Sequence, residues 1–277
     1  FIYKKMKISI LIIGKKSFIG SNLINSLNFF LVKIVNFEDI FDKNENYFKK
    51  FNYIINCTSN NRYNKNLYNE KYDHDFLIAQ KIQYLKILQI FLSSRKVYKI
   101  KNNIKETQKT YPTCNYSKNK IRTENKLKKL LKKKVLILRI SNLIGIKKYN
   151  NKKRKLYKTF SDIFFENIKK GIIIKNKDNY KDFLSIYKFC EIVEKLIKAR
   201  AFGTYNVSLG KKVYLDKLVK WLNEFNKHKH KLKEMPNNYK KQCFYLNNDK
   251  LMKKINIKNR LIDLENDCKK ISKLIFR

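Results

Sequence analysis

The sequence predicts an α/β protein in which a doubly wound parallel sheet carries a small C-terminal lobe. Short, nearly continuous apolar runs alternate with amphipathic stretches of helical length, as expected for strands that are buried on both faces. Hydrophobic residues make up 43% of the 277 residues, which is enough for a core of this size. A glycine-containing turn follows the first apolar run, as in nucleotide-binding α/β folds.

Strands and helices are expected to alternate through the first half of the chain. Right-handed crossovers between such elements produce a parallel sheet with helices on both faces. The expected strands are Ile8–Ile13, Val32–Val35, Tyr53–Cys57, Ile87–Leu92 and Val135–Ile140. The expected helices are Phe18–Asn28, Ile40–Lys50, His74–Tyr84 and Tyr116–Lys132.

After residue 150 the alternation becomes less regular. No linker rich in Pro, Gly or Ser separates the two parts, so we expect a first domain over residues 6–150 and a smaller lobe over residues 151–277 that packs on it. Helices are expected at Tyr157–Lys169, Tyr187–Lys198, Leu215–Asn226 and Leu261–Leu274. Short strands are expected near Ile172–Ile174, Phe183–Ile186 and Thr204–Val207.

Net charge is the unusual compositional feature. The chain has 65 Lys and Arg against 22 Asp and Glu, a formal net charge of +43. Lys outnumbers Arg 57 to 8 and is spread along the whole chain, whereas a phosphate-binding surface usually favours the planar fork of Arg. We interpret the charge as compositional bias and do not expect nucleic acid as a partner, although a polyanionic partner stays open.

The cysteines and the apolar runs indicate in which compartment the protein is expected and whether it associates with membranes. The five cysteines form no CxxC pair and no cluster with zinc spacing, so we expect no metal site and a reducing, cytoplasmic compartment. No apolar run reaches the length of a membrane span, and Ile8–Ile13 is too short for a signal peptide. We therefore expect no membrane association.

The turn after the first strand reads Gly14-Lys-Lys-Ser17-Phe-Ile-Gly20, in a chain with only six glycines. A turn of this kind brings the backbone close to a pyrophosphate, and the following helix offers free amides and the positive end of its dipole. The sequence therefore predicts that a dinucleotide is bound there by Gly14, Ser17, Phe18, Ile19 and Gly20.

The end of the second strand bears on the choice between NAD and NADP. A dinucleotide site usually places an acid there to hold the adenosine ribose. Asn36 and Glu38 are the candidates, with Asn36 at the strand end, while Lys15 and Lys16 could instead meet a 2′-phosphate. The sequence predicts NAD or NADP without resolving which.

Ser94, Tyr116 and Lys120 form the candidate catalytic set. Tyr116 and Lys120 are one helical turn apart and emerge on one face, and a nearby ammonium lowers the pKa of a phenol so that it can act as acid or base. Ser94 ends an apolar strand, where its hydroxyl can donate to a carbonyl oxygen. Such a set can move a proton while a nicotinamide moves a hydride.

These motifs resemble those of the extended short-chain dehydrogenase/reductases called NAD-dependent epimerase/dehydratases, which mostly act on nucleotide sugars. Ser17 stands where the family's first motif has its middle Gly, Ser94 precedes Val97-Tyr98 as the family's catalytic Ser/Thr does, and Tyr116 and Lys120 match its Tyr-x-x-x-Lys. Further segments that resemble the family are Asn52–Thr58, Leu138–Gly145, Lys181–Phe183, Gly203–Val207 and Asn248–Leu251.

The resemblance implies an NAD(P)-binding Rossmann domain at residues 6–150, a substrate-binding lobe at residues 151–277 and a nucleotide-sugar substrate. It further implies that Cys57 and Thr58 contact the cofactor and that Asn142 borders the substrate, which Ser94 also binds. Family members often form homodimers through the helices around the Tyr-x-x-x-Lys segment. A homodimer is therefore possible here, although like charges in Lys128–Lys134 would weaken it.

Two departures from the family narrow the expected reaction. Arg95 and Lys96 stand where the dehydratases of the family have an Asp-Glu pair, and Lys96 stands where the fucose-synthase branch has Cys. This leaves reduction of a keto sugar or epimerisation, and the short chain is closer to the compact dTDP-4-dehydrorhamnose reductase type. We therefore favour a reductase. The alternative is a catalytically silent cofactor-fold protein that binds RNA or an acidic partner through its basic surface.

Overall fold

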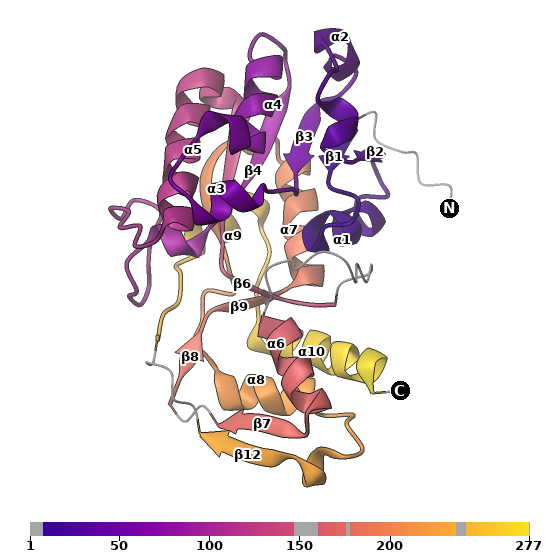
Figure 1. Ribbon diagram of the computed structural model, residues 1–277, viewed down its shortest axis with the longest axis vertical. Coiled ribbons are helices and arrows are strands. Elements are labelled where there is room, and N and C mark those ends of the chain that lie inside the picture. The colour runs from indigo at the N-terminus through magenta and orange to yellow at the C-terminus, as the bar shows by residue number, and fades with distance from the viewer. Residues whose placement is uncertain (1–7, 147–159, 176–177, 237–241, 277) are drawn as a thin grey trace.

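The computed structural model describes residues 8–146, 160–175, 178–236 and 242–276, and Figure 1 shows their arrangement. Its centre is a six-stranded parallel sheet with the order β10-β5-β4-β3-β1-β2. This confirms the predicted doubly wound α/β fold. The strands are β1 (Ser9–Ile13), β2 (Leu31–Val35), β3 (Tyr53–Asn56), β4 (Leu88–Ser94), β5 (Val135–Ile140) and β10 (Gly203–Val207).

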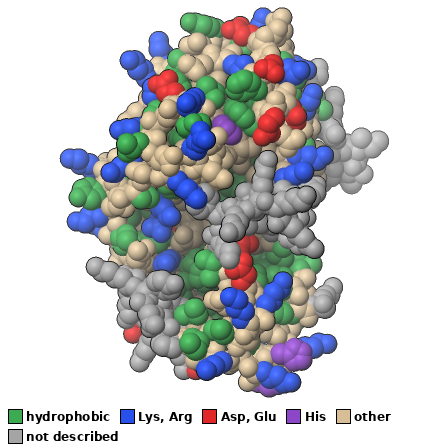
Figure 2. Space-filling model, in the orientation of Figure 1, with side chains coloured by type: hydrophobic (Ala, Val, Ile, Leu, Met, Phe, Trp, Pro, Cys, Tyr) green, Lys and Arg blue, Asp and Glu red, His purple; other side chains and the backbone are tan. Residues whose placement is uncertain are grey.

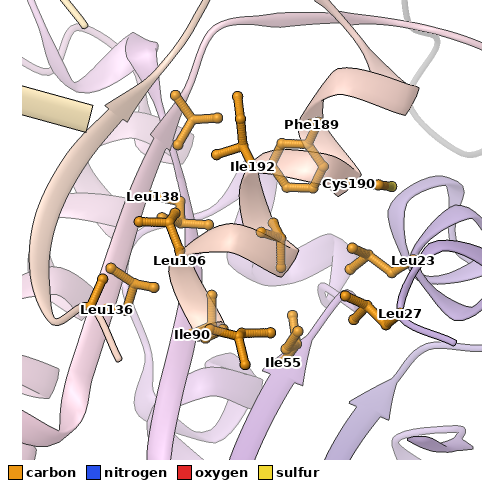
Figure 3. Close-up of a cluster of buried hydrophobic side chains, with 14 of the residues drawn as sticks. Leu23, Leu27, Ile55, Ile90, Leu136, Leu138, Phe189, Cys190, Ile192 and Leu196 are labelled. Atoms are coloured by element: carbon orange, nitrogen blue, oxygen red, sulfur yellow. The ribbon is translucent and has the colours of Figure 1, made fainter. Parts of the chain in front are cut away.

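Helices cover both faces of this sheet, because consecutive strand residues point to opposite sides. Ile10 and Ile12 of β1 belong to the core under α1 (Phe18–Ser26) and α7 (Ile186–Lys198). In Figure 3, side chains of α1 and α7 meet side chains of β3, β4 and β5 in that core. The other face carries α2 (Glu45–Phe48), α4 (His74–Ile82) and α5 (Asn115–Leu131).

The strand order reverses between β1 and β3. The chain leaves β1 for β2 on one side and then returns to β3 on the other side of β1. In the register, Ile10 of β1 lies between Val32 of β2 and Tyr53 of β3. Ligands of doubly wound sheets bind in the crevice outside the carboxyl ends of the strands at such a reversal. Gly14 and Cys57 directly follow the two strands concerned.

Figure 1 shows a lobe at the other end of the molecule that contains β6, β9, α6, α8 and α10. Side chains of these elements form a core of their own. Three two-stranded pairs, β6 with β9, β7 with β12 and β8 with β11, belong to this part. Its elements are β6 (Asn142–Ile144), α6 (Phe160–Lys169), β7 (Ile172–Lys175), β8 (Tyr180–Lys181), β9 (Phe183–Ser185), β11 (Val213–Tyr214), α8 (Leu215–Leu222), β12 (Lys233–Pro236) and α10 (Leu261–Ile275).

Some elements differ from the expectation. The helix expected at Ile40–Lys50 is wrong: a 3₁₀ turn at Glu38–Ile40 is followed by the short α2, because Asn44 adopts an extended conformation before α2. The first residues of the helix expected at Tyr157–Lys169 lie outside the described residues. The division at residue 150 stays a proposal, and β10 shows that the later part of the chain also supplies a strand to the main sheet. Two short helices, α3 (Asn61–Lys65) and α9 (Asp249–Ile255), complete the structure.

Within the described ranges, no helix combines the length and the apolar character that crossing a membrane requires.

Candidate active site

The turn between β1 and α1 is closed by the hydroxyl of Ser17. Its Oγ donates to the Gly14 carbonyl oxygen at 2.8 Å and accepts from the Gly20 amide at 2.9 Å. Gly14 has a φ of +113°, and a Cβ on Gly20 would lie 2.4 Å from the Gly14 oxygen, so both positions require glycine. The serine that replaces the family's middle glycine therefore turns its side chain into the turn.

The same turn fits the pyrophosphate of a dinucleotide. The first amides of a helix have no acceptor within the helix, and in α1 those of Phe18 and Ile19 lie in this first turn. Since Ser17 already satisfies the Gly20 amide, the Phe18 and Ile19 amides are the ones that can bind an anion at the positive end of the helix dipole.

Asn36 lies directly after β2, as expected. The carboxylate of Asp39 also belongs to the end of this strand, because it binds Asn36. The backbone amide and the side-chain amide of Asn36 both donate to one carboxylate oxygen of Asp39, at 2.8 and 3.2 Å. Sequence reasoning considered Asn36 and Glu38 and missed Asp39. The spacing of three residues between an amide and a capping carboxylate was the signal that could have identified it.

Cys57 and Thr58 lie against the turn. A Cβ on Gly14 would come within 2.9 Å of Thr58 Cγ2 and 3.2 Å of the Cys57 carbonyl carbon. The Thr58 hydroxyl is 2.7 Å from Asn56 Oδ1 and 2.9 Å from His74 Nδ1. The structure thus brings the ends of β1 and β3 together, whereas contact of Cys57 and Thr58 with the cofactor stays a prediction.

Helix α5 docks on the end of β4 through Lys120. The Lys120 ammonium is buried and donates to the Leu92 carbonyl oxygen at 2.9 Å. The same ammonium lies 5.8 Å from the ring centre of Tyr116, one turn earlier in α5. Because Leu92 precedes Ser94 by two residues in β4, this contact brings Ser94, Tyr116 and Lys120 to the carboxyl edge of the sheet.

The Ser94 hydroxyl is oriented by the chain that follows β4. Its Oγ accepts the Lys96 backbone amide at 3.2 Å, which caps the 3₁₀ turn Arg95–Val97. This contact uses an oxygen lone pair and leaves the hydroxyl hydrogen for a different acceptor. The Lys96 ammonium lies 5.7 Å from the Tyr116 ring centre, so the turn after Ser94 and the start of α5 face each other.

Two buried acids at the start of α4 were missed by the sequence analysis. Asp73 accepts hydrogen bonds from the Thr123 hydroxyl at 2.6 Å and the Tyr68 hydroxyl at 2.9 Å. Burial raises the pKa of Asp75 to about 7, against the opposing charge of Lys120. Acids are scarce in this chain, so two of them separated by a single residue were a signal for a special environment.

His74 lies between these acids in the sequence, and its ring contacts Phe37 and Thr58, which follow β2 and β3. Its ring stacks on Phe37 with a centroid distance of 3.6 Å and an interplanar angle of 5°. Burial lowers the pKa of His74 to about 4, although the charge of Glu38 opposes this. The imidazole is therefore neutral at neutral pH and can share a hydrogen bond with the Thr58 hydroxyl.

Opposite pH dependences of stability are expected from His74 and Asp75. The unfolded chain protonates His74 below pH 6.5 and the folded protein only below about 4, so acidification through this range favours unfolding. The folded protein keeps the Asp75 proton up to about pH 7, whereas the unfolded chain releases it above pH 3.8, so acidification from 7 favours folding. Between pH 7 and 5 each effect is about 2 kcal/mol.

The effects of His74 and Asp75 on stability cancel each other in the unmodified protein. A variant that lacks one of these two groups reveals the effect of the other. Relative to the unmodified protein, acidification from pH 7 to 5 should change the unfolding free energy by about 2 kcal/mol toward instability in Asp75→Asn and by about 2 kcal/mol toward stability in His74→Gln. Asp182, whose pKa burial also raises to about 7, contributes equally to all three proteins. Urea unfolding at both pH values measures this. Parallel pH profiles for the two variants would contradict the assignment.

A buried ion pair between α5 and β5 holds together the elements that carry the candidate catalytic residues. Arg139 of β5 and Glu124 of α5 form a 2.6 Å ion pair, and the Ser93 hydroxyl donates to the same carboxylate at 2.6 Å. Arg139 also donates to the Tyr98 hydroxyl at 2.8 Å, which in turn donates to Asn206 Oδ1 in β10. These bonds tie β4, α5, β5 and β10 together beneath Ser94.

Asn142 and Asp182 join the lobe to the main sheet. The Asn142 side-chain amide donates to the Asp182 carbonyl oxygen at 2.9 Å, so this nitrogen holds β6 on β9. The buried Asp182 carboxylate accepts the backbone amides of Leu209, Gly210 and Leu246 at 3.0 to 3.2 Å. Substrate binding by Asn142 stays a prediction, and the Asp182 motif has a structural role.

Solved structures with the same fold catalyse different reactions. A UDP-N-acetylglucosamine 4-epimerase from Methanobrevibacter ruminantium is 19% identical with a TM-score of 0.79, over 98% of this chain and 99% of that one. A dTDP-4-dehydrorhamnose reductase from Clostridium acetobutylicum is 18% identical, with a TM-score of 0.73 over 97% and 99%. A dTDP-glucose 4,6-dehydratase from Bacillus anthracis is 16% identical, with a TM-score of 0.71 over 96% of each chain.

At these identities the similarity concerns the fold. No curated protein sequence matches the chain at a significant level. The model of the NAD dependent epimerase/dehydratase family matches residues 10–208, which include every candidate site residue from Gly14 to Asn142. The family resemblance of the motifs is therefore confirmed: the chain belongs to the NAD-dependent epimerase/dehydratase family.

Proposed function

We propose that the chain is an oxidoreductase that acts on a nucleotide sugar and that its net reaction is the reduction of a keto group. Membership in the family makes NAD or NADP the cofactor. The observation that carries the proposal is the docking of α5 on β4, which gathers Ser94, Tyr116 and Lys120 at the carboxyl edge of the sheet.

Each of these residues has one part in the proposed mechanism. The nicotinamide, when bound, supplies the hydride. Tyr116 donates a proton to the substrate oxygen as the carbonyl is reduced, and Ser94 donates a hydrogen bond to the same oxygen. Lys120 holds the cofactor ribose and places a positive charge beside the phenol ring of Tyr116.

The turn after Ser94 supports reduction or epimerisation over dehydration. Elimination of water by this family's dehydratases uses an acid and a base that here are replaced by Arg95 and Lys96. The Arg95 guanidinium stacks over the Phe244 ring at 4.1 Å, and guanidinium does not exchange protons at neutral pH. Among the similar structures, both the dTDP-4-dehydrorhamnose reductase and the UDP-N-acetylglucosamine 4-epimerase are compatible with this loss.

Two further expectations belong to this proposal. A reducing compartment such as the cytoplasm is supported by the five cysteines, all of which are free thiols. Dimerisation through α5 stays a prediction. The alternative of a silent protein with a basic binding surface finds no support on the face shown in Figure 2, where Lys and Arg side chains are scattered among apolar and acidic ones.

Cofactor binding is the first test. Fluorescence titration with NADH and NADPH should show binding of at least one of them to the unmodified protein. Gly20→Ala should lose this binding, because its methyl group would lie 2.4 Å from the Gly14 oxygen and displace the turn. Asn25→Ala, an exposed position on the same helix, is the control and should bind normally. If neither cofactor binds to the unmodified protein, the proposal is wrong.

Hydride transfer is the second test. With cofactor deuterated at the transferred position and a nucleotide 4-keto sugar, reduction should consume the cofactor and place deuterium on the sugar. Redox-neutral epimerisation of a nucleotide sugar would leave the cofactor level unchanged and would identify the other branch of the family.

A further inference from the structure

A pocket of about 450 Å³ is lined by residues that neighbour the candidate catalytic residues in the sequence. Its lining includes Arg95 and Lys96, which follow Ser94, and Cys114, which precedes Tyr116 by two residues. Lys99 and Tyr111 line it as well. These lining residues therefore follow Ser94 and precede Tyr116 in the sequence. Three of the lining side chains, Arg95, Lys96 and Lys99, are cationic.

Arg95 is a half-buried cation without a counterion among the described residues. Its guanidinium rests on the Phe244 ring, and its Nε is shielded from solvent without a hydrogen-bond partner. In the part of the chain that the structure describes, Arg95 forms no ion pair with a carboxylate. A charge that is partly shielded from solvent without a partner is unfavourable, and an anion bound beside it would offset this cost.

Lys96 and Lys99 line the pocket together with Arg95 and strengthen the positive field there. Burial lowers the pKa of Lys181, and the charges of Arg95 and Lys96 lower it further against the opposing charge of Cys243, so Lys181 feels the positive field of both residues although it lies outside the pocket lining. Across the described ranges, neither Lys96 nor Lys181 forms an ion pair that would compensate this charge. Mutual repulsion of this kind disfavours the empty pocket and favours a bound anion.

We propose that this pocket binds an anionic group of the substrate, held by Arg95 and Lys96 while the reacting oxygen lies at Ser94. The inference rests on the proposed function and adds to it that the substrate carries a negative charge close to its reacting carbon. The planar guanidinium fork suits a carboxylate or a phosphate equally well. The anion is therefore either a carboxylate on the sugar ring or the diphosphate that joins sugar and nucleoside.

Binding of three probes separates the two sources. UDP, UDP-glucose and UDP-glucuronic acid are titrated calorimetrically into protein saturated with its nicotinamide cofactor. Arg95→Met keeps an apolar stem against Phe244 and removes the charge. Loss of a hydrogen-bonded charge contact should weaken binding by about 10- to 100-fold. A loss confined to UDP-glucuronic acid identifies a sugar carboxylate, and an equal loss for all three probes identifies the diphosphate.

Arg122→Met is the matched control, because Arg122 is exposed on α5 over the Tyr68 ring and lies outside the pocket lining. It removes the same charge from a chain of net charge +43 and should leave all three affinities unchanged. Equal losses in Arg95→Met and Arg122→Met would mean that the probes respond to overall charge, and would overturn the proposal.

Cys114 offers a readout that requires neither turnover nor a nucleotide-sugar substrate. This exposed thiol lines the pocket, so a bound anion should slow its alkylation by neutral iodoacetamide, measured by peptide mass spectrometry. Inorganic pyrophosphate should protect Cys114 in the unmodified protein and in Arg122→Met, and should protect it about 10-fold less in Arg95→Met.

The two assays keep the failure of this inference distinct from failure of the proposed function. If pyrophosphate, UDP and UDP-glucuronic acid all leave the alkylation rate of Cys114 unchanged, the pocket is not an anion site, even when cofactor binding and hydride transfer succeed. If Cys114 is protected but no cofactor binds, the anion site stands and the proposed oxidoreductase function is wrong.

Discussion

Replacement of Tyr116 by Phe is expected to lower kcat by about 10²- to 10⁴-fold, the usual contribution of general acid catalysis. The substitution keeps the ring, which lies 5.8 Å from the Lys120 ammonium and 5.7 Å from that of Lys96, and removes only the hydroxyl. Cofactor affinity should therefore barely change. Steady-state kinetics on the keto-sugar substrate, together with cofactor titration, measures both quantities.

Two further variants sharpen this result. Lys120→Ala should reduce turnover and also weaken cofactor binding, because the proposed role of Lys120 includes the cofactor ribose. Tyr84→Phe is the matched control, since Tyr84 is 81% exposed and lies in none of the site contacts described above. Near-full turnover of Tyr116→Phe would show that another group supplies the proton.

Glu124→Gln is expected to destabilise the fold by about 3–5 kcal/mol, the usual cost of removing one partner from a buried ion pair. Glu124 is fully buried, and it receives hydrogen bonds from the Arg139 guanidinium and from the Ser93 hydroxyl. The neutral amide leaves the charge of Arg139 buried without a counterion. The expected measurement is a lower urea midpoint with an unchanged m value.

A surface pair provides the control for Glu124→Gln. Glu191 forms a 2.8 Å ion pair with Lys188, three residues away on α7, but the Glu191 side chain is 42% exposed. Exposed pairs contribute about 0–1 kcal/mol, so Glu191→Gln should shift the midpoint little. A similar shift in both variants would show that the buried Glu124–Arg139 pair contributes no more to the free energy of unfolding than an exposed pair does.

The elements of the main sheet could be predicted from the sequence because their signal is local. Five apolar runs became β1 to β5 within a few residues, since a strand buried on both faces needs uninterrupted hydrophobic side chains. The Gly14–Gly20 turn was recognisable because both glycines have requirements that other residues do not meet. The helix expected at Ile40–Lys50 failed for a local reason as well, the extended backbone at Asn44.

What the sequence by itself determined is the order of the main-sheet strands and the family, and it named Ser94, Tyr116 and Lys120 as candidates. The tertiary structure alone decided which of them meet. Lys120 reaches the Leu92 carbonyl across 28 positions, and Glu124 pairs with Arg139 across 15. Neither spacing has a periodicity that sequence patterns reveal. The missing counterion of Arg95 could not be recognised in such a lysine-rich sequence. Whether a cation lacks a counterion depends on its burial and on residues far away in the sequence, and only the packing of the chain establishes both.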